Sequence, residues 1–316
     1  MKKTLTMILA TFAFAIASAE AALVYNPNFY SHSISRWNTE GPSYSPTTFL
    51  SGVFLPIGVA VDPSGNVYVS QYTGAISKYT AAGALVSSIS LGYLPYNIRF
   101  DINGTLYVVD HDNSAIRRYD NNLTPLSNWV TTSGKPTSIQ FSPEGFVLVT
   151  NAGAGDNVQK FSIDGTLLQT IGNSSQLNEP HDAISDPSGN ILVGDRQNQR
   201  IVKYNSAGAL IDNNFITGFD PYGMLVSGST LFVAKHDNPG MIRRYDVSSG
   251  SFLGDFAVGN FPTFISVNPN DIAPSSSSIP EPSQVAASLL LLSCISGYVF
   301  IKSRKAQKTA LAIFAA

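Results

Sequence analysis

Cysteine is almost missing from this sequence of 316 residues, and the single one, Cys294, lies in an apolar run near the C-terminus. An intrachain disulfide is therefore excluded, and stability must come from packing and hydrogen bonds. A Gly-x-Ser-x-Gly elbow, a His-Glu-x-x-His pair and a glycine-rich phosphate loop are absent as well. Nucleophilic and phosphate-transfer catalysis therefore have no recognisable motif.

An excess of positive charge is also lacking. Residues 22–271 contain 13 Lys and Arg against 19 Asp and Glu, a net charge of −6. Nucleic-acid-binding domains usually carry a basic patch, because they neutralise phosphates. We therefore expect no nucleic acid among the partners of this chain.

The N-terminus has the composition of an export signal. Two lysines precede an apolar stretch at 5–17, and small residues at Ala19 and Ala21 suit a signal peptidase. We predict a secretory signal peptide at 1–21 and export through the Sec pathway. An uncleaved N-terminal anchor is the alternative, which the shortness of the apolar stretch disfavours.

The C-terminus contains three features in a fixed order. They are the motif Pro280-Glu281-Pro282-Ser283, an uncharged apolar run at 285–301, and a basic cluster of Lys302, Arg304, Lys305 and Lys308. At a rise of ~1.5 Å per residue the run just crosses a thin hydrocarbon core, and basic residues directly after it stay in the cytoplasm. We predict a linker at 272–284, a transmembrane helix at 285–301 and a cytoplasmic tail at 302–316, with residues 22–271 outside the inner membrane.

This order of parts resembles the PEP-CTERM sorting signal, which the membrane enzyme exosortase reads. The resemblance implies that exosortase is a partner, that it cuts near Pro280-Glu281-Pro282, and that inner-membrane attachment is transient before release to the cell envelope or outside the cell. It also implies an association with extracellular polysaccharide and biofilm material. Permanent attachment by a plain single-span anchor is the alternative.

The body of the chain repeats a unit of about 40 residues. The unit begins at a proline, and the successive prolines are 39, 41, 44, 41 and 41 residues apart: Pro56, Pro95, Pro136, Pro180, Pro221 and Pro262. In the first five units a turn glycine follows, then an alternating apolar strand, then a strand that ends in a basic-aromatic pair such as Lys78-Tyr79. Such a period and such turns predict the blades of a β-propeller.

The sixth unit begins at Pro262 and stops after Val267, so its remaining strands must come from elsewhere in the chain. Residues 24–26 and 34–37 have the patterns of the second and third strands. We predict an all-β, six-bladed propeller over 22–271 with four-stranded antiparallel blades. Its last blade takes the inner strand from the C-terminal end and three outer strands from the N-terminal end, which leaves no free edge.

The blade pattern resembles the NHL repeat, most closely in residues 180–204. That segment has the start Pro180-His181-Asp182, the turn Asp186-Pro187-Ser188-Gly189 and the strand end Val193-Gly194-Asp195-Arg196. The resemblance implies the propeller fold. It does not imply a function, because propellers of this kind serve as scaffolds, binding modules and enzymes.

One face of the predicted ring gathers most of the polar and aromatic side chains. It is the face where each inner strand starts and the second strand turns into the third. The candidate ligand-binding residues there are Tyr96, Asn97, His181, Asp182 and Tyr222 near the channel, with Asp110, His111, Asp195, Arg196 and His236 further out. The alternative for the Asp and Asn residues is that they only cap tight turns.

The sequence predicts no cofactor. A divalent cation in the channel is the hypothesis that stays open. Lactonases of the gluconolactonase type hold such an ion with carboxylate and Asn groups, and Asp182, Asn97 and Asp110 offer that chemistry. Peptide-amidating lyases hold zinc with several channel histidines, and only His181 stands at an equivalent position. His111 and His236 belong to opposite blades, too far apart for one zinc ion.

These observations favour a noncatalytic exported protein of the cell envelope or extracellular matrix, which binds a protein or polysaccharide through one face of a rigid propeller. A metal-dependent hydrolase or lyase that works in the channel is the alternative.

Overall fold

The computed structural model describes residues 22–39, 44–153 and 155–267, all within the first of two compact units, Met1–Ala273. The predicted signal peptide at 1–21, the linker at 272–284, the apolar run at 285–301 and the basic tail lie outside the described residues. In the described part of the chain, no helix is long and apolar enough to cross a membrane.

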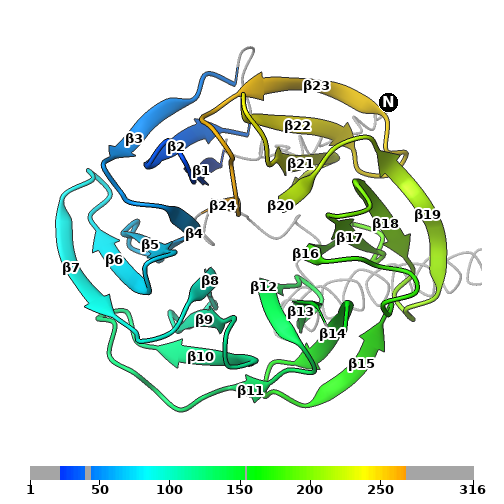
Figure 1. Cartoon of the computed structure of the whole chain (residues 1–316), viewed down its shortest axis with the longest axis horizontal. Helices are drawn as coiled ribbons and strands as arrows, with labels where there is room; N and C mark the ends of the chain where they lie inside the picture. The colour runs from blue at the N-terminus through cyan, green and yellow to red at the C-terminus, as the bar shows by residue number, and fades with distance from the viewer. Residues whose placement is uncertain (1–21, 40–43, 154, 268–316) are drawn as a thin grey trace, which may run out of the picture. The chain divides into compact units, whose positions relative to one another are not determined.

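Six four-stranded antiparallel sheets are arranged as blades around a common axis (Figure 1). Five of them use strands in chain order from the axis outward. These are blade 1, β4 (Pro56–Val61), β5 (Val67–Gln71), β6 (Ala75–Tyr79) and β7 (Leu85–Ser90); blade 2, β8 (Pro95–Phe100), β9 (Leu106–Asp110), β10 (Ala115–Tyr119) and β11 (Val130–Thr131); blade 3, β12 (Lys135–Phe141), β13 (Phe146–Ala152), β14 (Asn157–Ser162) and β15 (Leu167–Ile171); blade 4, β16 (Pro180–Ser185), β17 (Ile191–Asp195), β18 (Arg200–Tyr204) and β19 (Leu210–Thr217); and blade 5, β20 (Pro221–Ser227), β21 (Thr230–Lys235), β22 (Met241–Asp246) and β23 (Phe252–Ala257).

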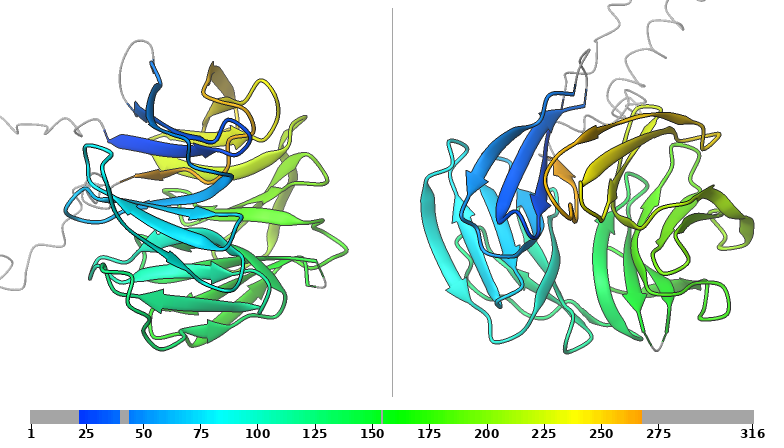
Figure 2. Two further views of the ribbon diagram at one scale, coloured as in Figure 1. Left: turned by 60° about the vertical axis from the view of Figure 1, so that its left-hand side comes forward. Right: turned by 45° about the horizontal axis from the view of Figure 1, so that its top comes forward.

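Blade 6 joins the two ends of the described chain. It comprises β24 (Ser266–Val267), β1 (Leu23–Asn28), β2 (Ser33–Asn38) and β3 (Thr47–Ser51), in that order from the axis. β24 pairs antiparallel with β1, with Val24 opposite Val267, and Figure 2 shows the two strands side by side. The prediction of a six-bladed propeller closed in this way is confirmed.

The repeated Asp-x-x-Gly segments form the turns between the first and second strands of a blade. In blade 1, Asp62 Oδ1 accepts hydrogen bonds from the amides of Ser64 and Asn66, each at 2.9 Å. Gly65 adopts a φ of +82°, a left-handed conformation that favours glycine. The same contacts recur at Asp186 in blade 4. The same short motif therefore forms the first hairpin of both blades.

The core lies between neighbouring blades, because alternate residues of each strand face opposite neighbours. On β5, Val67 and Val69 pack against side chains of blade 6, whereas Tyr68 between them packs against blade 2. Trp37 of blade 6 is 2% exposed and packs on Phe232 of blade 5 with ring centroids 5.0 Å apart. Each interface between neighbouring blades therefore buries an apolar face of both sheets. The hydrophobic stabilisation of the ring arises at these interfaces.

Polar contacts near the axis add a second type of link between consecutive blades. In each, a side-chain hydroxyl donates to a backbone carbonyl of the next blade around the ring. Three of them are Ser70 to Tyr96 at 2.6 Å, Thr137 to Pro180 at 3.1 Å and Thr263 to Ile57 at 2.5 Å.

Candidate functional site

One face of the ring is formed by the turns between second and third strands and by the connections that lead into the next inner strand; we call it the pocket face. Backbone hydrogen bonds join these two sets of loops: His111 N donates to Leu94 O at 3.2 Å and His236 N donates to Asp220 O at 3.1 Å. The sequence predicted that the starts of the inner strands lie on the same face as these turns, and the structure shows this arrangement.

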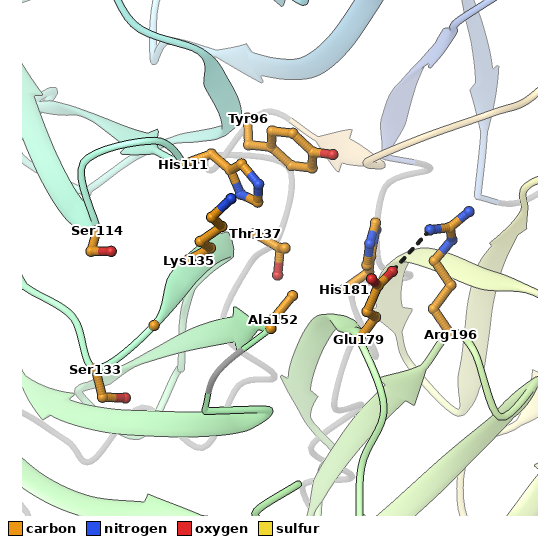
Figure 3. Close-up of a pocket in the computed structure, with 12 residues that line it drawn as sticks. Tyr96, His111, Ser114, Ser133, Lys135, Thr137, Ala152, Glu179, His181 and Arg196 are labelled. Carbon is orange, nitrogen blue, oxygen red and sulfur yellow. Dashed lines mark hydrogen bonds and ion pairs between the residues drawn. The ribbon is translucent and has the colours of Figure 1, made fainter.

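A cavity of about 510 Å³ opens on the pocket face over blades 2, 3 and 4 (Figure 3). Its lining combines aromatic, cationic and anionic groups. The residues that define its chemistry are Tyr96 and His111 from blade 2, Lys135 and Thr137 from blade 3, and Glu179, His181 and Arg196 from blade 4.

His111 and His236 occupy equivalent places in blades 2 and 5. The His111 ring stacks on Tyr96 with centroids 4.5 Å apart, and its Nδ1 lies 3.0 Å from Pro136 O of the next blade. The His236 ring stacks on Tyr222 at 4.4 Å, and its Nδ1 lies 3.1 Å from Pro262 O. Because a carbonyl only accepts, Nδ1 carries a proton in both rings and donates it to this carbonyl.

His181 lies between these two pairs, at the floor of the cavity. Its ring meets Tyr222 edge-on at 4.3 Å, and its side chain is almost fully buried. Burial above all, and then the charge of Arg196, holds the His181 pKa well below its usual range. The imidazole is therefore neutral, and its Nδ1 has no hydrogen-bond partner among the described residues.

Beneath His181 a polar network fills the axis. Arg99 donates from Nη1 to Val59 O at 3.1 Å, from Nη2 to Ile265 O at 2.5 Å and from Nε to Gln140 at 3.3 Å. The Gln140 amide in turn donates to the carboxylate of Asp182, which also accepts from Met224 N at 2.8 Å. These groups come from all six blades, so the network ties the ring together at its centre.

Asp182 and Asn97, two of the candidate ligand-binding residues, are fully buried at this level. Burial raises the Asp182 pKa to about 6 in spite of the charge of Arg99, whose own pKa burial lowers to about 10. Asn97 Oδ1 accepts from Ile139 N at 3.5 Å, and its Nδ2 has no partner among the described residues. Neither residue lines the cavity.

Asp110 and Asp195 lie under the turns of the pocket face and are fully buried. Asp110 accepts from Arg117 Nε at 2.6 Å and from Asn113, while Asp195 accepts from Arg200 Nε at 2.7 Å. These contacts hold each turn to the third strand of its own blade. Both carboxylates therefore cap turns, which was the alternative to ligand binding in the sequence analysis.

Arg196 reaches over the cavity edge between two acidic groups. It lies 3.5 Å from Glu179 and 3.3 Å from Asp220, and its guanidinium is 6.0 Å from the Tyr222 ring centroid. Lys135, on the opposite side of the cavity, is exposed and makes no ion pair within the described residues. The cavity therefore has one paired and one unpaired cation on its rim.

Of the ten candidate residues from the sequence, four line the cavity: Tyr96, His111, His181 and Arg196. Tyr222 contacts His181, and His236 stacks on Tyr222. The sequence analysis missed Lys135 and Glu179. Both stand directly before a blade's first proline, and a comparison of that position across the repeats would have singled them out, because the other occupants except Asp220 are uncharged. In the described ranges, no group of three or more His, Cys, Asp or Glu side chains is placed to hold a metal ion.

No family model matches the sequence. Among solved structures, a chain of the nidogen/laminin complex is 17% identical and superposes with a TM-score of 0.68, covering 78% of this chain and 98% of that one. Virginiamycin B lyase from Staphylococcus aureus is 13% identical with a TM-score of 0.57, covering 76% and 82%. Hydrazine synthase from Kuenenia stuttgartiensis is 14% identical with a TM-score of 0.59, covering 84% and 94%. At these identities the likeness concerns the fold.

Proposed function

We propose that this protein is an exported, noncatalytic binding protein of the cell envelope or extracellular matrix, and that the cavity on the pocket face is its ligand site. The observation that carries the proposal is the contrast between the two levels of the axis. An open cavity with charged and aromatic walls lies directly above a buried Arg99–Gln140–Asp182 network. A ligand can bind above, while the network below serves the stability of the ring.

The proposed export rests on the two ends of the sequence. The N-terminal signal at 1–21 would direct the chain through the Sec pathway, and the apolar run at 285–301 would attach it to the inner membrane. On the resemblance to PEP-CTERM proteins, exosortase would then cut near Pro280 and release the propeller. Mass spectrometry of the exported protein tests this step: a new C-terminus within 272–284 supports it, and an intact C-terminus at Ala316 favours a permanent anchor.

A retention experiment tests the binding function. We expect the exported protein to sediment with isolated envelope and matrix material from the cells that produce it. The double variant Lys135→Ala, Glu179→Ala should lose at least tenfold in apparent affinity, because both side chains form the cavity rim. A double variant of the opposite face, Lys160→Ala with Glu144→Ala, serves as the matched control. Equal retention of the two double variants would contradict the proposal.

A second candidate is a lyase, and one observation favours it. His181 is a neutral imidazole that lines the cavity, and a neutral imidazole can remove a proton from a bound substrate. Lyases are among the proteins of similar fold, at 13 to 16% identity. If catalysis occurs, His181→Ala should abolish turnover while substrate binding persists. If the protein only binds, the same variant should alter affinity alone.

A metal-dependent hydrolase is less well supported by the geometry. Its proposed ligands were Asp182, Asn97 and Asp110, and the carboxylate of Asp182 is engaged by Gln140 and Met224 while that of Asp110 is engaged by Arg117. Elemental analysis of the purified protein tests this reading. A stoichiometric divalent ion that is lost in Asp182→Ala would favour it.

A further inference from the structure

Aromatic rings continue from the cavity across the pocket face to blades 6 and 1. Each ring in this series contacts the next, with centroids 4.4 to 5.7 Å apart. The series runs Tyr222, His236, Phe261, Tyr30, Phe29 and Tyr72. Edge-to-face and offset contacts of this kind are the arrangements that aromatic pairs prefer, so the rings form one continuous series.

The far end of this series is open to solvent. Tyr30 is 59% exposed and Tyr72 is 51% exposed. Phe54, in the connection between blades 6 and 1, is 53% exposed and stacks on His32 with centroids 4.9 Å apart. Exposed aromatic side chains that cluster on one face mark a binding surface, because they offer a large apolar area at little cost in side-chain entropy.

These rings stand close to the cavity. Ser70, two residues before Tyr72 in blade 1, donates to the backbone carbonyl of Tyr96 in the cavity wall at 2.6 Å. A ligand in the cavity that extends over the edge of blade 2 therefore reaches the loop of blade 1 that carries Tyr72.

The composition of this surface distinguishes between classes of partner. The exposed groups here are flat rings beside polar neighbours. The large exposed aliphatic side chains of the propeller lie elsewhere, on outer strands β7, β15, β19 and β23 and in connections at Ile102, Leu126 and Ile163. The C–H bonds on one face of a sugar ring carry partial positive charge and are attracted to the negative face of an aromatic ring. The unpaired ammonium of Lys135 in the cavity adds a site for an anionic group.

We propose that Tyr30, Phe54 and Tyr72 form an outer subsite of the cavity, and that the ligand is an acidic polysaccharide. Its pyranose rings would stack on the three side chains while a uronate carboxylate meets Lys135. This inference rests on the proposed binding function and specifies its ligand. A chain ligand is required, because a single sugar cannot reach both subsites.

Binding of galacturonate oligomers to the exported full-length protein tests the inference by calorimetry. We expect affinity to rise at least tenfold between the dimer and an oligomer long enough to reach both subsites. The double variant Tyr30→Ala, Tyr72→Ala should remove this gain. Lys135→Ala should weaken binding of dimer and long oligomer alike and lessen its salt dependence. Phe252→Ala, which removes an equally exposed ring of blade 5, is the matched control and should bind as wild type.

The outcomes separate this inference from the proposed function. No binding of oligomers, no gain with length, or an unchanged affinity of the Tyr30/Tyr72 variant would overturn the acidic polysaccharide as ligand. Tighter binding of a neutral dextran than of the uronate oligomer would overturn it as well. So would a protein partner whose binding is lost in the Tyr30/Tyr72 variant. In each case the retention of the Lys135/Glu179 variant on matrix material decides independently whether the cavity binds a ligand.

Discussion

Arg99 and Asp182 are joined through a single side chain, Gln140, which accepts from the guanidinium at 3.3 Å and donates to the carboxylate at 3.2 Å. The three residues belong to blades 2, 3 and 4, and their other contacts reach blades 1, 5 and 6. A charge of each sign is thus held at the axis without direct contact between them.

Replacement of Arg99 should destabilise the ring. Arg99→Met removes the hydrogen bonds to three backbone carbonyls and to Gln140 and leaves Asp182 as an uncompensated buried charge. We therefore expect a loss of about 3 to 5 kcal/mol in the free energy of unfolding. Arg118→Met, which removes an arginine that bonds to Ser127 near the surface, should cost less than about 1 kcal/mol. Urea denaturation measures both. A loss for Arg99→Met no larger than that for Arg118→Met would contradict the network.

The raised pKa of Asp182 predicts a pH dependence of known sign. Between the unfolded value near 3.9 and the folded value of about 6, the folded state holds a proton that the unfolded state has lost. The contribution of Asp182 to stability is therefore full below pH 4 and falls as pH rises to 6.

The size of this fall is about 3 kcal/mol for a shift of two pH units. The measurement is the difference in unfolding free energy between wild type and Asp182→Asn at pH 4 and at pH 6, which cancels the titration of other groups. Asp255→Asn, at an exposed carboxylate, is the surface control for the substitution itself. A wild-type advantage that grew with pH would show that the Asp182 pKa is lowered instead.

Closure of blade 6 should depend on Trp37. The indole packs on Phe232 and Phe256 of blade 5 and donates to Asn26 at 3.1 Å. Trp37→Ala should therefore cost about 4 kcal/mol, whereas Phe252→Ala at the exposed rim should change stability by less than about 0.5 kcal/mol. Thermal and urea unfolding check both values. A cost below 1 kcal/mol for Trp37→Ala would mean that this interface is not essential to the ring.

Two strand glycines, Gly223 on β20 and Gly194 on β17, should respond differently to the same substitution. A Cβ on Gly223 would lie 2.5 Å from Phe264 Cα and 2.6 Å from Thr263 O, both backbone atoms of blade 6. Gly223→Ala should therefore force blades 5 and 6 apart and cost about 1 to 3 kcal/mol. Gly194→Ala, whose Cβ would find its nearest neighbour at 3.5 Å, should be tolerated. Equal stability of the two variants would contradict the close approach of the blades.

The repeats in the sequence were sufficient to predict the fold. The proline spacing, the Asp-x-x-Gly turns and the truncated unit at Pro262 led to six blades and to the pairing of the chain ends, because each depends on local patterns and on a count. The pocket face was also predicted correctly, since its position follows from which loops share an end of the blade.

The division of roles among the polar residues could not be predicted from the sequence. Asp182 and His181 are neighbours in sequence, yet one is bonded into the axis and the other faces the cavity, because successive strand residues point in opposite directions and a register shift separates Pro180 from Asp182. Arg99 was missed because it stands between Ile98 and Phe100 in an otherwise apolar strand end. The outer aromatic series was missed because its rings come from loops of blades distant in sequence.

Hydrogen exchange of the exported protein, with and without its matrix ligand, tests the central claim most directly. Binding at the cavity predicts slower exchange in the turns at 111–114 and 196–199 on the pocket face and unchanged exchange in the turns at 62–66 and 186–190 on the opposite face. Protection confined to the opposite turns, or equal on the two faces, would contradict a ligand site on the pocket face.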